Sequence, residues 1–85
     1  MVIVMRIEIN DYIVSDSGIC GGTPTFSGTR IMVWQVLEML EGGMSVEEII
    51  SSFGVPLKKE HISAALNYAG IIAKGRDNVV IGIDR

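Results

Sequence analysis

Three short apolar stripes at helical spacing, separated by glycines, constrain most strongly what this chain can fold into. The first stripe has the i, i+3, i+4, i+7 spacing of one helix face and stops at Gly42-Gly43. The second follows a capping box in which Ser45 is the N-cap and the Glu48 side chain reaches back to it. We expect the buried residues of these two helices to be Val33, Val36, Leu37, Leu40, Val46, Ile49, Ile50 and Phe53.

The third stripe follows the tight connection at residues 54–56 and predicts a helix from Leu57 or Lys58 to about Ala73, with Gly75 as its stop. Its expected buried residues are Ile62, Ala65, Leu66 and Ala69. Residues 34–69 should therefore form a three-helix unit whose last two helices are joined by a three-residue turn containing glycine. This pattern is typical of a helix-turn-helix. The periodicity leaves one alternative open, which is a plain three-helix bundle that does not bind in a groove of DNA.

Short strands are expected on both sides of the helices. Residues 5–9 alternate apolar and polar side chains, as in a half-buried strand, and after a turn at Asn10-Asp11 residues 12–14 return as a second strand. Residues 15–29, rich in Gly, Ser and Thr, predict a loop or irregular arm. A last strand is expected over residues 79–83. We therefore expect one domain, mainly α with short β-strands: strands and arm over 1–30, helical core over 31–74 and a C-terminal strand over 75–85.

The sequence contains no disulfide or zinc site that could stabilise so short a chain. A chain of 85 residues buries only about 60–65 % of its unfolded surface. The single cysteine, Cys20, rules out an internal disulfide and leaves too few thiols for a zinc ribbon. Because 48 % of the residues are hydrophobic, we expect a homodimer that buries apolar surface between its subunits.

The net charge is −3 and the isoelectric point is near 4.9, which argues against strong sequence-independent binding of nucleic acid. Over residues 30–73, three basic residues against five glutamates leave a net charge of −2. No stretch reaches the roughly 20 apolar residues of a membrane span, and residues 1–5 lack the basic segment that precedes a signal peptide. A free cysteine without an export signal leads us to expect a cytoplasmic protein.

Several motifs carry a resemblance to a known family. They are DSGICGG at residues 16–22, Pro24, GTRI at residues 28–31 with Val33-Trp34, GMSVEEI at residues 43–49 and AALNYA at residues 64–69. In this order they resemble the domain of unknown function 433 family over residues 13–70. The resemblance implies a helix-turn-helix related to the homeodomain-like and transposase group. Some members of the family look like antitoxins, encoded beside toxins with a PIN ribonuclease domain, which block the nuclease and repress their own operon.

The chain departs from the family pattern at three positions. The arm has Thr23 and Ser27 where the family often carries basic residues, which removes positive charge from any DNA contact made there. The third helix opens at Lys58 where the family usually has a Ser or Thr cap.

The candidate DNA-binding residues are Lys58, Lys59, Asn67 and Arg30. Two cations at a helix N-terminus oppose the macrodipole by about 0.3–1 kcal/mol each, so they are either a solvated surface or a contact to phosphates. Asn67 lies about two turns along the same helix, where it reads an adenine edge or is an ordinary surface residue. For Arg30 we consider a second role, an ion pair with Asp16 that ties down the glycine-rich arm. Phosphate binding by the arm is disfavoured, because no lysine follows its glycines.

The sequence offers no support for catalysis or for a cofactor. His61 is the only histidine and has no ligand-type spacing to Cys20, so a metal site is not expected. Trp34, Phe53 and Tyr68 lie on or beside the apolar stripes and are expected in the core or in a dimer interface. No small-molecule substrate or membrane is implied.

Two functions remain open at this stage. The first is a homodimeric helix-turn-helix antitoxin that binds a PIN-type ribonuclease toxin, with or without operator DNA, and has Lys74, Arg76 and Arg85 as cations available to the carboxylates of the nuclease. The second is a non-catalytic interaction module that does not touch nucleic acid.

Overall fold

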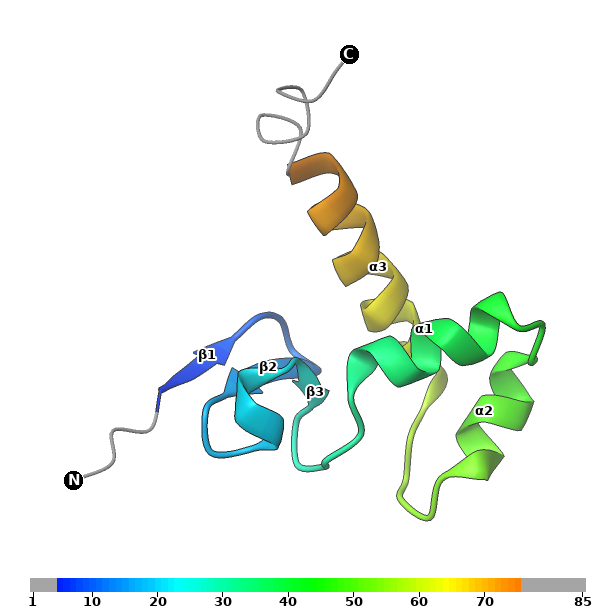
Figure 1. Ribbon diagram of the computed structural model, residues 1–85. Coiled ribbons are helices and arrows are strands. Elements are labelled where there is room, and N and C mark those ends of the chain that lie inside the picture. Colours follow the sequence, from blue (N-terminus) through cyan, green and yellow to red (C-terminus); the bar gives the residue numbers. More distant parts are fainter. Residues whose placement is uncertain (1–4, 76–85) are drawn as a thin grey trace.

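The computed structural model describes residues 5–75, which form three helices and a small three-stranded antiparallel sheet (Figure 1). The strands are β1 (Arg6–Glu8), β2 (Ile13–Asp16) and β3 (Thr25–Phe26), in the order β1-β2-β3. The helices are α1 (Val33–Glu41), α2 (Val46–Ser52) and α3 (Lys59–Gly75), and a short 3-10 helix, η1 (Cys20–Gly22), lies between β2 and β3. The fold is mainly α with short β-strands, as predicted. The strand predicted over residues 79–83 lies outside the described residues.

The predicted turn between the first two strands is confirmed. The side-chain oxygen of Asn10 accepts hydrogen bonds from the backbone N–H groups of Tyr12 (2.8 Å) and Ile13 (2.9 Å), which closes the turn locally. The prediction that the first strand is half-buried is wrong for Ile7, which is 58 % exposed. The reason is that β1 is the outer strand, whereas the core lies against β2 and β3.

The glycine-rich segment, residues 15–29, is more regular than its composition predicts. It contains the end of β2, the 3-10 helix and β3. Cys20, Gly21 and Gly22 all adopt positive φ angles (51°, 65° and 90°), so the glycines allow a left-handed turn that leads into β3. The backbone N–H of Phe26 then donates to the carbonyl of Ile31 (3.0 Å), which folds the segment back before α1.

The first two helices form as predicted. Of their expected buried residues, Val33, Val36 and Ile49 are buried, whereas the others are only partly buried against the core: Leu37, Leu40, Val46, Ile50 and Phe53. α1 ends at a Gly42 cap, and Gly43 takes a φ of +97° that a side chain would strain. Both halves of the capping box are formed at α2: the Glu48 N–H donates to Ser45 Oγ (3.1 Å) and the Ser45 N–H donates to Glu48 Oε1 (2.8 Å).

The connection between α2 and α3 spans residues 53–58 and is longer than the predicted three residues. Phe53 leaves α2 in an extended conformation (φ −105°, ψ 148°). Pro56 disfavours helical geometry at Val55, and the Leu57 N–H donates to the Val55 carbonyl (2.8 Å). Leu57 is 5 % exposed, so its side chain packs the connection against the core directly before α3 begins.

α3 packs against α1, α2 and β2 through Ile62 and Ala65, and its C-terminal half extends away from the rest of the described chain (Figure 1). Leu66 was expected in the core but is 52 % exposed. It lies about 100° round the helix from Ala65, on the side that turns away from the other helices. All of residues 70–75 are exposed.

One apolar core joins the sheet to the helices. Its buried members are Ile13, Phe26, Ile31, Val33, Val36, Ile49, Leu57, Ile62 and Ala65. Phe26 and Ile13 are completely buried, so the sheet is one wall of the helical core and not an appendage to it.

Candidate functional site

The N-terminus of α3 carries two exposed lysines, and a histidine side chain takes part in capping this helix. Lys58, directly before the helix, has no cap-forming side chain, but its backbone N–H donates to Nδ1 of His61 (3.0 Å). The His61 N–H in turn donates to the Lys58 carbonyl (3.0 Å). The histidine thus takes the reach-back role that Glu48 plays in α2, and the lysine side chains of Lys58 and Lys59 remain exposed.

Two aromatic rings hold His61 in this position. The Tyr12 ring lies 4.9 Å from the imidazole centroid and the Phe26 ring 5.6 Å, both edge-on. Burial against these rings, and secondarily the positive charge of Lys58, lowers the pKa of His61. A neutral imidazole is also what the Lys58 N–H requires, because Nδ1 must accept. Sequence reasoning considered His61 only as a metal ligand; its place three residues after the cap was the signal for this role.

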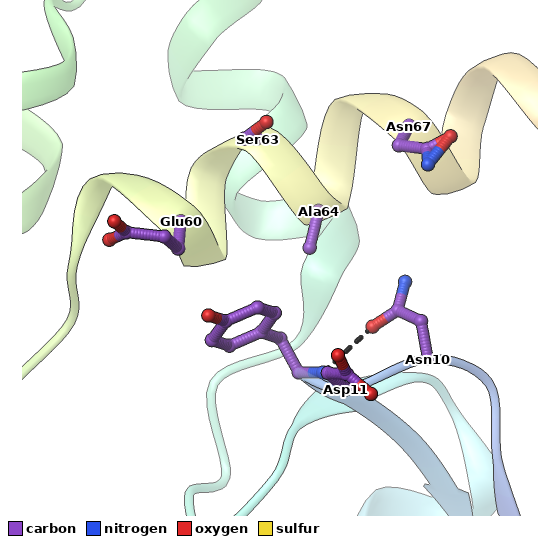
Figure 2. A pocket seen from close by; sticks show the side chains of 7 residues that line it. Asn10, Asp11, Glu60, Ser63, Ala64 and Asn67 are labelled. Carbon is purple, nitrogen blue, oxygen red and sulfur yellow. Dashed lines mark hydrogen bonds between the residues drawn. The ribbon is translucent and has the colours of Figure 1, made fainter.

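Asn67 lines a cleft of about 370 Å³ between α3 and the β1–β2 turn (Figure 2). Glu60, Ser63, Ala64 and Asn67 form the helix side of the cleft, and Asn10, Asp11 and Tyr12 form the turn side. Lys58 and Lys59 do not line it. Asn67 therefore shares its surroundings with the carboxylates of Asp11 and Glu60, which repel phosphate.

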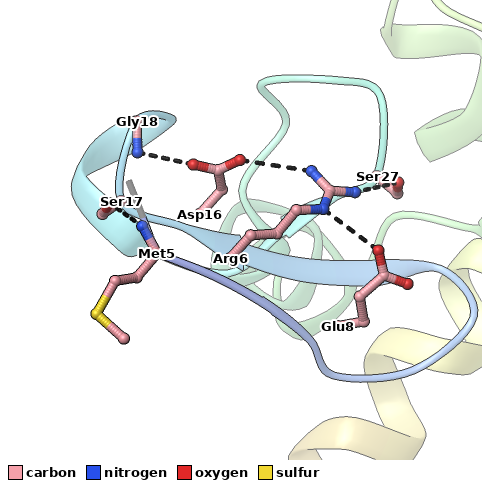
Figure 3. A network of polar contacts seen from close by, with 7 residues as sticks. All are labelled: Met5, Arg6, Glu8, Asp16, Ser17, Gly18 and Ser27. Atoms are coloured by element: carbon pink, nitrogen blue, oxygen red, sulfur yellow. Dashed lines mark hydrogen bonds and ion pairs between the residues drawn. The ribbon is translucent and has the colours of Figure 1, made fainter. Parts of the chain in front are cut away.

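Arg30 is exposed and does not pair with Asp16, so that prediction is wrong. Arg6 pairs with Asp16 instead (Nη1 to Oδ2, 3.4 Å), because the two residues are directly opposite each other in the β1–β2 ladder. The same guanidinium contacts Glu8 (3.2 Å) and Ser27 Oγ (3.4 Å), which ties the hairpin to the segment after β3 (Figure 3). The hairpin register was the signal that would have identified Arg6.

Exposed charges are divided unevenly among the helices. The segment of α3 and its cap carries three lysines and one glutamate, which are Lys58, Lys59, Lys74 and Glu60. α1 and α2 carry four exposed glutamates and no lysine or arginine; these are Glu38, Glu41, Glu47 and Glu48. The overall net charge of the sequence does not show this difference, because the positive charge of α3 and the negative charge of α1 and α2 partly cancel in the sum.

Trp34 lies at the surface of α1 and is 47 % exposed, so it is not a core residue. Its indole N–H is directed at the sulfur of Met32 (3.3 Å), which orients the ring. One side of Trp34 lines a groove of about 550 Å³ with Glu38, Met39 and Phe53. It also lines a smaller apolar hollow of about 200 Å³ with Pro24, Val33, Leu37 and Tyr68.

Within residues 5–75, no three His, Cys, Asp or Glu side chains are grouped so that they could hold a metal ion. Over the same residues, no helix combines the length and the hydropathy needed to cross a bilayer.

Comparison with known proteins gives a family but no close relative. No curated protein and no solved structure matches the chain. The model of a family described as "Protein of unknown function (DUF433)" matches residues 13–69, from the first residue of β2 to the middle of α3. Because this match spans well over half of the 85 residues, the chain belongs to the DUF433 family.

Proposed function

We propose that the protein is an antitoxin-type helix-turn-helix protein that binds operator DNA through the N-terminal part of α3. The division of charge supports this most directly. Lys58 and Lys59 make no ion pair within residues 5–75, and they occupy a helix N-terminus where the macrodipole favours anions over cations. A phosphate placed there satisfies both the lysines and the helix. Two lysines contact few phosphates, so the proposal requires a homodimer, which presents two copies of this helix N-terminus to the DNA.

The packing of the helices is compatible with a homeodomain-like helix-turn-helix. α2 and α3 contact each other and α1, and the exposed Lys58 and Lys59 lie at the N-terminus of α3. In such a unit the N-terminal residues of the last helix enter the major groove. The long α2–α3 connection departs from the usual three to four residues, and the buried Leu57 supplies the rigidity that a short turn otherwise gives.

The DNA proposal is tested by gel retardation with the DNA upstream of the gene. We expect Lys58→Gln with Lys59→Gln to weaken the retardation strongly at low salt. Since each phosphate contact contributes about 0.9 to the slope of log K against log salt, a dimer that loses four lysines should lose between 3 and 4 units of slope. The control is Gln35→Glu with Ser51→Glu, which lowers the charge equally on the α1–α2 side and should leave binding intact. Retardation that is insensitive to the lysine substitutions and to salt contradicts the proposal.

The antitoxin part of the proposal names a PIN-type ribonuclease toxin as the protein partner, and the cytoplasm as the place where both act. Of the cations considered for its active site, Lys74 lies in the last turn of α3; Arg76 and Arg85 lie outside the described residues. Co-expression with the neighbouring reading frame is the test. A PIN-domain protein that co-purifies in fixed ratio supports it, and a neighbour of another class with no complex contradicts it.

A non-catalytic interaction module that does not bind DNA is the second candidate. The acidic side of α1 and α2 and the half-exposed Trp34 favour it, because both are features of a protein-binding surface rather than of one that meets phosphates.

A further inference from the structure

The groove beside Trp34 has the composition of a docking site for a peptide segment. Its walls come from two helices and the residue that follows the second: Trp34, Glu38 and Met39 from α1, Ser52 from α2, and Phe53 directly after it. The indole N–H is directed at the Met32 sulfur (3.3 Å), a weak contact that favours this orientation of the ring. Aromatic residues with this degree of exposure (47 %) are typical anchors of protein interfaces.

The charge around the groove selects the occupant. Glu38 lies one helical turn after Trp34, and therefore on the same face of α1, and it lines the groove directly. Glu41 continues this stripe, and Glu47 and Glu48 add two further carboxylates on α2, with no cation on either helix. A guanidinium that stacks on the indole would reach the Glu38 carboxylate at the same time, which combines a cation–π contact with a charge-assisted hydrogen bond.

We propose that this groove, named here the Trp34 groove, binds a basic amphipathic segment of a partner protein. An arginine of that segment lies over Trp34 toward Glu38. A neighbouring aliphatic side chain enters the apolar hollow of about 200 Å³ that Trp34 also lines, together with Pro24, Leu37 and Tyr68. The inference rests on the protein-binding part of the proposed function and is independent of DNA binding, which uses the opposite charge on a different helix.

The groove can be tested with a defined probe, because Trp34 is the only tryptophan of the chain and reports on its own occupancy. The probe is a short blocked peptide in which arginine and leucine alternate, titrated into the full-length protein at low salt. Two matched peptides carry citrulline or glutamate in place of arginine. We expect a saturable change in Trp34 fluorescence with the arginine peptide, at least tenfold weaker binding of the citrulline peptide, and no binding of the glutamate peptide.

Two variants separate the groove from general charge attraction. Glu38→Gln should weaken binding of the arginine peptide at least fivefold. Glu41→Gln changes the charge equally on the same helix but does not line the groove, and it should change binding less than twofold. Trp34→Phe should retain part of the affinity and Trp34→Ala should lose it, both measured by calorimetry on variants whose thermal unfolding shows that they are folded.

Equal binding of the three peptides, or equal effects of Glu38→Gln and Glu41→Gln, would overturn the inference. Its failure is distinguishable from failure of the proposed function. If a PIN-domain protein co-purifies with the wild type and equally well with Glu38→Lys, this assignment of the surface is wrong and the antitoxin proposal stands. If no such protein co-purifies while the arginine peptide binds as expected, the groove is supported and the antitoxin proposal fails.

Discussion

The backbone N–H of Lys58 donates to Nδ1 of His61 over 3.0 Å, so a histidine three residues into α3 forms the reach-back half of a capping box, whereas the lysine side chain cannot form the other half. Only half of a capping box is formed, because a lysine side chain at this position offers no acceptor to the first-turn N–H groups, and two exposed cations stand where the helix dipole disfavours them. Helix stability alone does not favour lysines here, whereas the proposed contact with phosphates would.

Lys58→Ser should therefore stabilise the protein and weaken its binding to DNA. A serine supplies the missing half of the box, which is worth about 0.5–1 kcal/mol in the free energy of unfolding. It also removes one phosphate contact per subunit. Urea denaturation measures the first effect and gel retardation at low salt measures the second. A stabilised variant with wild-type DNA affinity would show that the lysine is only a solvated surface residue.

Stability should decrease in mildly acidic solution because of His61. Burial against Tyr12 and Phe26, followed by the charge of Lys58, lowers the pKa of His61 in the folded state below its ordinary value of 6.5. Between the folded and unfolded pKa values the unfolded chain binds more protons, so the free energy of unfolding falls as the pH falls below about 6.5. The loss is complete once the pH is below the folded-state pKa.

The variant His61→Gln isolates this effect. Glutamine keeps an acceptor for the Lys58 N–H but does not titrate. Urea denaturation at pH 7.5 and at pH 5.5 should show a smaller difference for the variant than for the wild type. The same difference in both proteins would assign the pH dependence to other groups.

Features that depend on residues close together in the chain were predictable from the sequence. The capping box of Ser45 and Glu48, the stop at Gly42-Gly43 and the hairpin turn at Asn10 each depend on contacts within three or four residues. Their chemistry is fixed by residue type and spacing, so the pattern alone determines the outcome.

Features that depend on distant residues were not predictable. Thr25 and Phe26 lie in a segment rich in Gly, Ser and Thr, and nothing local shows that they face a helical core. The partner of Asp16 was misassigned because Arg6 and Arg30 are equally plausible until the strand register is known. The positions of Lys58 at the start of the third helix and of Lys59 and Asn67 along it were predicted. The cleft that gives Asn67 acidic neighbours depends on the packing of the hairpin turn against α3, which the sequence does not show.

The hydroxyl of Thr25 leads to a stabilising substitution. Thr25 is fully buried, and its Oγ1 has no hydrogen-bond partner among the described residues. Thr25→Val replaces the hydroxyl with a methyl group of similar size and should raise the free energy of unfolding by about 1 kcal/mol. Thr25→Ser retains the hydroxyl, removes a buried methyl group and should lower it by about 1 kcal/mol. Thermal and urea unfolding measure both, and a destabilised valine variant would mean that the hydroxyl is satisfied in solution.

The exposed end of α3 is where the proposed homodimer should form. The core-facing stripe of the helix continues from Ala65 through Tyr68 to Ile72, but burial decreases along it, and Ile72 is already 38 % exposed. Its neighbour Ile71 is 59 % exposed. Since no other part of residues 5–75 buries these two side chains, a second copy of the helix is the partner we expect to cover them.

Ile71→Lys with Ile72→Lys should convert the dimer into a folded monomer. Lysine keeps the helix propensity but cannot be buried between two subunits without a large desolvation cost. Val55→Lys, at an exposed apolar position (37 %) in the α2–α3 connection, is the control and should remain dimeric. Light scattering at tens of micromolar measures the mass, and circular dichroism confirms that the helices persist. A wild-type protein of monomer mass would contradict the proposed homodimer. It would also contradict DNA binding by two copies of the α3 N-terminus.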